Sequence, residues 1–412
     1  MINKKSDLGN GSLAPHKVPV RAITDHGESD YRAAMGIQTL DSHQPRRFHD
    51  DWNGPLLEVD DLHLEFMTRN GRVRVLNGVS YDVNAGEALA VLGESGSGKS
   101  VTAQAIMGLL DTPPAYLVKG EIRYRGNDLL KASDTQRRQI RGREIAMVFQ
   151  DALSALNPVF PVGWQIAETL RVRLGMSRHE AHQRAIELMD LVKIPAARQR
   201  VNEYPHQFSG GMRQRVMIAM ALALNPAILI ADEPTTALDV TVQAQIMDLL
   251  QELRRELNMA LILITHDLGV VADIADRVVV MYAGRVVERA DVEDLYTTPA
   301  HPYTAGLLDS IPRLDIKGHR LRSIAGTPPD PAQIPPGCAF HPRCPHAEPV
   351  CTREVPPPHP LQGNRISACH FAERMVRAAQ EARWRTSVED APSQGEDARY
   401  HDRDHDWDQW KK

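Results

Sequence analysis

The stretch from Gly93 to Ser100 holds residues whose types and spacing suit phosphate chemistry. It reads Gly-Glu-Ser-Gly-Ser-Gly-Lys-Ser, follows the apolar run 88–92, and precedes a helical pattern that begins at Ser100. Glycines let the backbone curl so that its N–H groups point at an anion, and a helix N-terminus adds partial positive charge. We expect Lys99 to reach the β- and γ-phosphates of ATP and the Ser100 hydroxyl to hold Mg²⁺. The residues expected to bind nucleotide here are Gly93, Ser95, Gly96, Ser97, Gly98, Lys99, Ser100 and Val101.

A second segment supplies carboxylates of the kind that this chemistry needs. Residues 227–231 form a short apolar run that ends in Asp232-Glu233. A carboxylate at the end of such a buried strand can lie beside the phosphate loop and bind Mg²⁺ through water, which is the role expected for Asp232. Glu233 is then placed to orient or deprotonate an attacking water.

Between these two segments, Ser209-Gly210-Gly211 precedes a long helical pattern. The triplet, in this order between a phosphate loop and an Asp-Glu strand, resembles the signature loop of the ATP-binding subunits of ABC transporters. Met212 stands where that family usually has Gln, as in the peptide-importer subunits. The resemblance implies that Ser209, Gly210 and Gly211 complete the ATP site of a second subunit from a helix N-terminus.

Further matches follow in the order that the family predicts. Gln150 resembles the glutamine that ends the Q-loop strand and contacts Mg²⁺, and Asp239 lies in a segment similar to the D-loop. His266 follows the apolar run 261–264 and matches the switch histidine at the γ-phosphate. Phe66 lies where the family places an aromatic ring against adenine, although packing in the core is an alternative for it. Glu233, His266 and Gln150 are thus the expected catalytic residues.

Length and composition set outer bounds. The 412 residues suffice for one large and one small domain, and the net charge of −5, with 42% apolar and 25% charged residues, argues against a nucleic-acid partner. No apolar stretch is long enough to span a bilayer, and no secretory signal follows Lys4 and Lys5. We therefore expect a peripheral protein at the cytoplasmic face of the inner or plasma membrane.

The pattern along the chain predicts an α/β fold. The resemblance implies an ABC-type P-loop ATPase with a RecA-like α/β core, an antiparallel β layer and a helical subdomain. The predicted parts are a disordered tail at 1–54, the ATPase domain at 55–300 with its helical subdomain at about 151–225, a C-terminal extension at 301–372, and a disordered tail at 373–412 after a short helix. Trp164 is a candidate contact for a membrane partner, although we favour core packing for it.

The four cysteines all lie in the C-terminal extension, and its Pro- and Gly-rich loops suggest a metal site before a disulfide. Close pairs typical of structural zinc sites are absent, whereas iron–sulfur clusters accept varied spacing. Resemblance to the extensions of oligopeptide and dipeptide importer ATPases implies a [4Fe–4S] cluster, which we favour over zinc and over unliganded thiols. The expected ligands are Cys338, Cys344, Cys351 and Cys369.

The closest resemblance is to the oligopeptide importer ATPase. It implies an ATPase that powers uptake of oligopeptides or dipeptides through two permease subunits, with an extracytoplasmic peptide-binding protein. Because the sequence holds one phosphate loop, we expect a second ATPase subunit, and a similar chain in preference to a second copy of this one. The alternatives are an importer ATPase for another solute, such as nickel, and a soluble ABC ATPase outside transport.

Overall fold

The computed structural model describes residues 52–236, 238–310 and 323–389. Most of the tail expected at 1–54, and residues 390–412 of the tail expected at 373–412, lie outside the described residues. The helix expected at the start of the second tail is present as α13, which covers Ala372–Glu389 and is longer than the short helix expected there. The described helices contain no segment with both the length and the apolarity needed to cross a bilayer.

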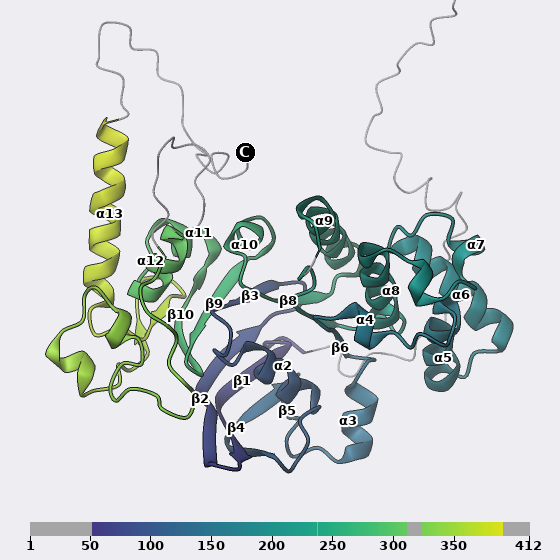
Figure 1. The fold of residues 1–412 in the computed structure, drawn as a ribbon, viewed down its shortest axis with the longest axis horizontal. Coiled ribbons are helices and arrows are strands. Elements are labelled where there is room, and N and C mark those ends of the chain that lie inside the picture. The colour runs from purple at the N-terminus through teal and green to yellow at the C-terminus, as the bar shows by residue number, and fades with distance from the viewer. Residues whose placement is uncertain (1–51, 237, 311–322, 390–412) are drawn as a thin grey trace, which may run out of the picture. The chain divides into compact units, whose positions relative to one another are not determined.

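An antiparallel sheet of order β2-β1-β4-β5 forms one layer (Figure 1). Apolar and polar residues alternate along its first strand, so that Leu57, Val59, Leu62 and Leu64 are buried. A tight turn at Asn70-Gly71 connects the first two strands. The strands are β1 (Leu57–Thr68), β2 (Gly71–Val83), β4 (Ala115–Tyr124) and β5 (Asn127–Asp128).

The second sheet forms the core and has the order β11-β12-β10-β9-β3-β8-β7-β6. Strands β9, β3, β8, β7 and β6 run parallel, and most of their residues are buried apolar side chains, as expected for strands covered on both faces. The carboxyl ends of these parallel strands share one edge, where the chemistry predicted from the sequence is gathered. The bounds are β3 (Ala88–Leu92), β6 (Ile145–Val148), β7 (Ile228–Asp232), β8 (Ala260–Thr265), β9 (Arg277–Tyr282), β10 (Arg285–Asp291), β11 (His359–Pro360) and β12 (Ile366–Ser367).

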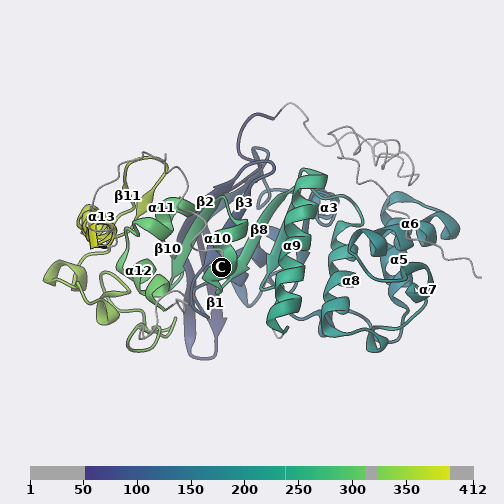
Figure 2. The same cartoon turned by 90° about the horizontal axis from the view of Figure 1, so that it is seen from above.

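Helices flank this sheet and build the subdomain expected at 151–225 (Figures 1 and 2). A capping box starts one of these helices, with the Glu180 amide donating to Ser177 Oγ at 3.3 Å. The α-helices are α2 (Lys99–Met107), α3 (Asp134–Ile140), α4 (Ala152–Ala155), α5 (Val162–Leu174), α6 (Arg178–Leu191), α7 (Ala197–Arg200), α8 (Gly210–Leu222), α9 (Val240–Leu257), α10 (Leu268–Ile274), α11 (Val292–Thr297), α12 (Pro302–Asp309) and α13.

The C-terminal extension is joined to the core sheet, which the sequence did not predict. Strand β12 pairs with β10 through Ser367 and Glu288, and β11 pairs in turn with β12. Glu288 is buried, accepts hydrogen bonds from the backbone N–H groups of Ala300 and His301, and lies 3.6 Å from the Arg365 guanidinium. The extension thus shares the sheet and its buried polar contacts with the ATPase domain.

Candidate nucleotide site and cysteine pocket

The phosphate loop connects β3 to α2, as the sequence predicted. At two of its glycines, a residue with a side chain would clash with neighbouring atoms. A Cβ atom at Gly93 would lie 2.3 Å from the Met281 carbonyl oxygen. Gly98 has a φ of +103°, and a Cβ there would lie 2.7 Å from Leu76 Cδ2. The loop therefore packs against its neighbours at distances that only glycine allows.

Lys99 is buried at the start of α2. Its Nζ donates to the carbonyl oxygens of Gly93 at 2.7 Å and Glu94 at 3.0 Å, so the ammonium group is held inside the loop. Burial lowers the pKa of Lys99, and the nearby carboxylates of Glu233, Asp232 and Glu94 oppose that shift. A desolvated ammonium group with few fixed partners is suited to binding an anionic phosphate.

The pair expected to hold Mg²⁺ is assembled. Ser100 Oγ donates to Asp232 Oδ1 at 3.0 Å, although 132 residues separate them in sequence. Burial raises the pKa of Asp232, and the neighbouring Glu233 carboxylate raises it further. The buried hydroxyl of Ser97 has no hydrogen-bond partner among the described residues. An unpaired donor and a desolvated carboxylate fit the oxygens of a phosphate and a hard cation.

The three expected catalytic residues meet at the Glu233 carboxylate. Gln150 Nε2 donates to Glu233 Oε2 at 2.8 Å, and His266 Nδ1 lies 3.4 Å from Oε1. Thr236 Oγ1 also donates to Oε2, at 3.0 Å, a contact that its place in the D-loop segment did not predict. The His266 side chain is 66% exposed and is free to turn toward a ligand. These contacts fix the orientation of the Glu233 carboxylate.

The signature residues are also in their expected local structure. Ser209 caps α8 by accepting a hydrogen bond from the Met212 amide at 3.4 Å, and Asp239 caps α9 through the Val242 amide at 2.9 Å. A Cβ at Gly211 would lie 2.5 Å from Val242 Cγ1, so glycine lets the two helix starts approach closely. Within the described residues, no hydrogen bond joins this signature to the phosphate loop.

Two expected contacts with nucleotide remain predictions. Phe66 is partly buried and packs against the apolar core beneath the antiparallel sheet, which leaves its adenine contact untested. Val101 also packs there, from the first turn of α2.

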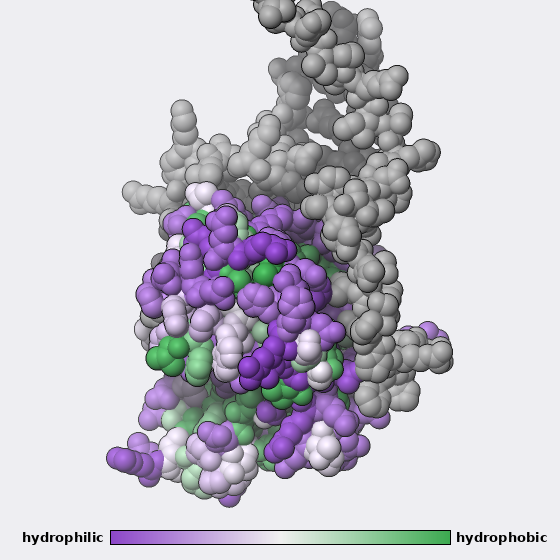
Figure 3. Space-filling view, turned by 90° about the vertical axis from the view of Figure 1, so that its right-hand side faces the viewer, coloured by the Kyte–Doolittle hydropathy of each residue, from purple (hydrophilic) through white to green (hydrophobic). Residues whose placement is uncertain are grey.

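An exposed apolar group follows Gln150 in the chain. Phe160 and Trp164 stack with ring centroids 4.2 Å apart and are 38% and 39% exposed, beside the more exposed Val159. The core position that we favoured for Trp164 is therefore wrong, because its ring packs on Phe160 at the surface. Figure 3, which faces the helical subdomain, shows apolar side chains among hydrophilic ones on this side of the protein.

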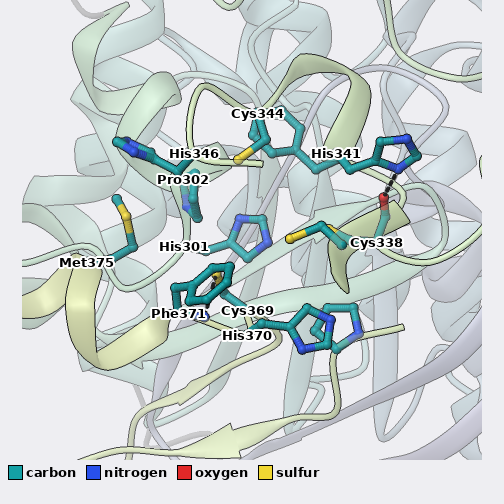
Figure 4. Close-up of a pocket in the computed structure, with 13 residues that line it drawn as sticks. His301, Pro302, Cys338, His341, Cys344, His346, Cys369, His370, Phe371 and Met375 are labelled. Atoms are coloured by element: carbon teal, nitrogen blue, oxygen red, sulfur yellow. Dashed lines mark hydrogen bonds between the residues drawn. The ribbon is translucent and has the colours of Figure 1, made fainter. Parts of the chain in front are cut away.

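All four cysteines line one pocket in the C-terminal extension, with about 370 Å³ of empty space that includes some open solvent. Figure 4 shows Cys338, Cys344 and Cys369 coming from separate segments around this space. His341 turns aside and donates from Nδ1 to the Cys338 carbonyl at 2.9 Å. Burial raises the pKa of the Cys369 thiol to about 11 and also raises the pKa values of Cys338 and Cys344.

A metal site in this pocket is not established. In the part of the chain that the structure describes, no group of three or more His, Cys, Asp or Glu side chains is arranged to hold a metal ion. Four free, largely desolvated thiols share this pocket.

Comparisons with known proteins bear on both parts of the chain. Residues 76–236 match the family described as "ABC transporter", and residues 287–351 match "Oligopeptide/dipeptide transporter, C-terminal region". The oligopeptide transport ATP-binding protein OppD of Salmonella typhimurium is 51% identical over 314 residues, which cover 76% of this chain and 93% of that protein. The dipeptide transport ATP-binding protein DppD of Bacillus subtilis is 52% identical over 301 residues, covering 73% of this chain and 90% of that protein.

Solved structures agree at the level of the ATPase domain. The dimeric, post-hydrolysis structure of the ATP-binding cassette MJ0796 bound to ADP and Pi has a TM-score of 0.52 and 28% identity, and covers 57% of this chain and 98% of that one. These similarities show that the chain is an ABC-type ATPase, which agrees with its assembled phosphate loop. The chain belongs to the ABC transporter family, among the ATP-binding subunits related to OppD and DppD.

Proposed function

We propose that this protein hydrolyses ATP to power the import of oligopeptides or dipeptides. The observation that carries the proposal is the similarity to peptide transport ATP-binding proteins, which extends over 93% of OppD and includes a match to the C-terminal region of these transporters. Substrate would pass through two permease subunits after delivery by an extracytoplasmic peptide-binding protein. The protein would act at the cytoplasmic face of the membrane.

The site geometry supports specific roles for the residues. The phosphate loop and Lys99 would bind the β- and γ-phosphates, and Ser100, Asp232 and Gln150 would hold Mg²⁺, which polarises the terminal phosphate. Glu233 would take the proton of the attacking water, because its carboxylate is already oriented by its hydrogen bonds. His266 would contact the γ-phosphate after turning from Glu233.

The signature loop supports a two-subunit site. Ser209, Gly210 and Gly211 lie at the N-terminus of α8, where partial positive charge favours an anion, yet they make no hydrogen bond to the described phosphate loop of their own chain. They would instead complete the site of a second ATPase subunit, with Asp239 at the same interface. We propose a similar ATPase as that partner, in preference to a second copy of this chain.

The stacked pair Phe160 and Trp164 supports a docking surface for the permeases. Exposed aromatic rings are enriched at protein interfaces, and this pair follows Gln150 closely in the chain. Permease binding at this pair would couple conformational changes of the permeases to Gln150, which donates a hydrogen bond to Glu233.

Transport of labelled peptide tests the substrate. In cells that lack the endogenous gene, the intact chain with its permeases should restore ATP-dependent uptake of labelled di- to oligopeptides. The Lys99→Ala variant should abolish both uptake and nucleotide binding, because it removes the buried phosphate ligand. Uptake of Ni²⁺ but not of peptide would overturn the peptide proposal, and hydrolysis without any dependence on permeases would favour a role outside transport.

We further propose that the four thiols bind a [4Fe–4S] cluster. A tetrahedral zinc ion with Zn–S bonds of about 2.3 Å would draw four sulfurs to within about 4 Å of each other. A cluster distributes its four thiolates over four iron atoms and accepts a wider arrangement. The four thiols line one pocket from separate segments of the extension, and this arrangement supports the second description. Such a cluster would tie the loops of the extension together.

The metal content of the native protein tests this assignment. Protein purified without oxygen should be brown and contain about four iron atoms per chain. Colourless protein with one zinc per chain would replace the cluster by zinc, and protein free of both metals would leave reduced thiols as the functional state.

A further inference from the structure

A partly buried ion pair joins the cysteine-bearing loops to the phosphate loop. Arg343, the residue before Cys344, donates from Nη1 to Glu94 Oε2 at 2.6 Å and from Nη2 to Glu94 Oε1 at 3.0 Å. The two residues are 249 positions apart in sequence, and the Arg343 side chain is only 5% exposed. A forked, two-bond contact of this kind fixes orientation as well as charge.

The arginine is held in place from the extension and from the core. Its Nε donates to the Ala325 carbonyl at 3.0 Å, and its guanidinium lies about 6 Å from the ring centres of Tyr282 and Phe340. Phe340 is 2% exposed, so this aromatic packing excludes water. Arg343 is therefore fixed before any ligand binds.

Glu94 is an unusual neighbour for a phosphate. It follows the first glycine of the phosphate loop, its carbonyl accepts from Lys99, and its negative charge is felt at the Lys99 ammonium. Its backbone N–H donates to the Tyr303 hydroxyl at 2.9 Å, a second contact from the C-terminal part of the chain. Without a partner, this carboxylate would repel the phosphates of ATP.

We propose that Arg343 is a positioning residue for ATP: it neutralises Glu94, so that the C-terminal extension sets the affinity of the phosphate loop for nucleotide. The inference rests on ATP binding at this loop and on none of the proposals about peptide or metal. Through this contact, a residue of the extension is placed beside the phosphate loop of the ATPase domain. Arg343 acts on ATP through Glu94 and touches no phosphate itself.

A double-mutant cycle on Arg343 and Glu94 in the full-length protein tests whether the arginine acts by neutralising the glutamate. ATP dissociation constants are measured by calorimetric titration for the native chain and for Arg343→Gln, Glu94→Gln and the double variant. Arg343→Gln should weaken binding on the order of tenfold, because it leaves a partly buried carboxylate unpaired near the phosphates. Glu94→Gln should strengthen binding, and the double variant should return to within about threefold of the native value.

Arg374→Gln is the matched control, because it breaks the Arg374–Glu348 ion pair of 2.8 Å at the surface of the same extension. It should leave the affinity for ATP unchanged. Arg343→Lys keeps the positive charge and should retain most of the affinity for ATP. This variant distinguishes the effect of the charge from the effect of the two-bond guanidinium contact.

Two results would overturn the proposal. If the double variant binds ATP as weakly as Arg343→Gln, the contact is a structural clamp and not a charge balance. If Arg343→Gln binds as tightly as the native chain, the extension does not act on the loop. Thermal unfolding followed by circular dichroism shows whether each variant is folded. If Arg343→Gln is misfolded, the ATP affinities of Arg343→Lys and Glu94→Gln are compared with that of the native chain instead. Failure of the native chain to bind ATP would instead refute the nucleotide site.

Discussion

The nucleotide site and the cysteine pocket are built in opposite ways. In the nucleotide site, Asp232 and the phosphate loop lie at the ends of buried parallel strands, and most side chains already have partners. The cysteines lie on loops and short 3₁₀ turns such as Pro349–Thr352, and their thiols are desolvated. The first site is preorganised by the sheet, whereas the second depends on its neighbours and on whatever it binds.

The two regions differ in the contacts that hold their backbones in place. Parallel strands fix the edge of the core sheet without any ligand, since their backbone hydrogen bonds are internal. In its described residues, the extension contributes two short strands to that sheet, together with the buried Arg365–Glu288 contact. We therefore expect substitutions in the nucleotide site to change chemistry, and substitutions in the pocket to change stability.

The largest effect should come from Glu233→Gln. An amide cannot accept the proton of water, so steady-state ATP hydrolysis should fall about 10²- to 10⁴-fold while ATP binding persists. Phosphate release and nucleotide titration measure the two properties. Glu252→Gln is the control, because it alters a surface carboxylate paired with Lys193 and should leave turnover unchanged. Undiminished hydrolysis by Glu233→Gln would remove the assigned base.

A smaller effect, on stability, should follow Cys369→Ser. Serine lacks the thiolate that iron requires, so iron content should fall and the melting temperature should drop by roughly 5–10 °C, with ATP affinity retained. Met375 lines the same pocket without a thiol, and Met375→Leu should retain the metal. Equal iron content and equal melting temperature for Cys369→Ser and the native protein would refute the cluster, and a loss of ATP affinity would refute the separation of the two regions.

The smallest effect should be a pH dependence that originates at His301. Burial lowers the pKa of His301 to about 3, so the folded protein keeps this ring neutral while the unfolded chain binds a proton below pH 6.5. Its contribution is fully present above pH 6.5, and the free energy of unfolding should fall by up to about 1.4 kcal/mol per pH unit below that.

The variant His301→Asn tests this contribution. Asn can still accept from the Tyr303 amide at the start of α12, and it does not titrate. Denaturant unfolding between pH 6.5 and 4.5 should therefore give a flatter pH profile for the variant. Glu288, whose pKa is raised by burial, is present in both proteins and cancels from the difference. Parallel profiles would show that His301 is protonated in the folded state.

Much of the nucleotide site could be predicted from the sequence. The phosphate loop, Asp232 and Glu233 follow apolar runs directly, and a local pattern is sufficient to place a residue at the end of a buried strand. Trp164 was placed wrongly, because an aromatic residue on an amphipathic helix has the same local pattern whether it lies inside or at the surface. Helix α13 is longer than the short helix expected there, because the polar composition of residues 373–389 resembles that of a disordered tail.

The sequence by itself determined the ATPase fold and the identity of its chemical groups, since short patterns fix which residues end strands and begin helices. Only the tertiary structure decided that the extension adds strands to the core sheet and that Arg343 pairs with Glu94. The physical reason is distance along the chain: a contact across 249 residues depends on how two independently patterned segments pack, and no local pattern records that packing.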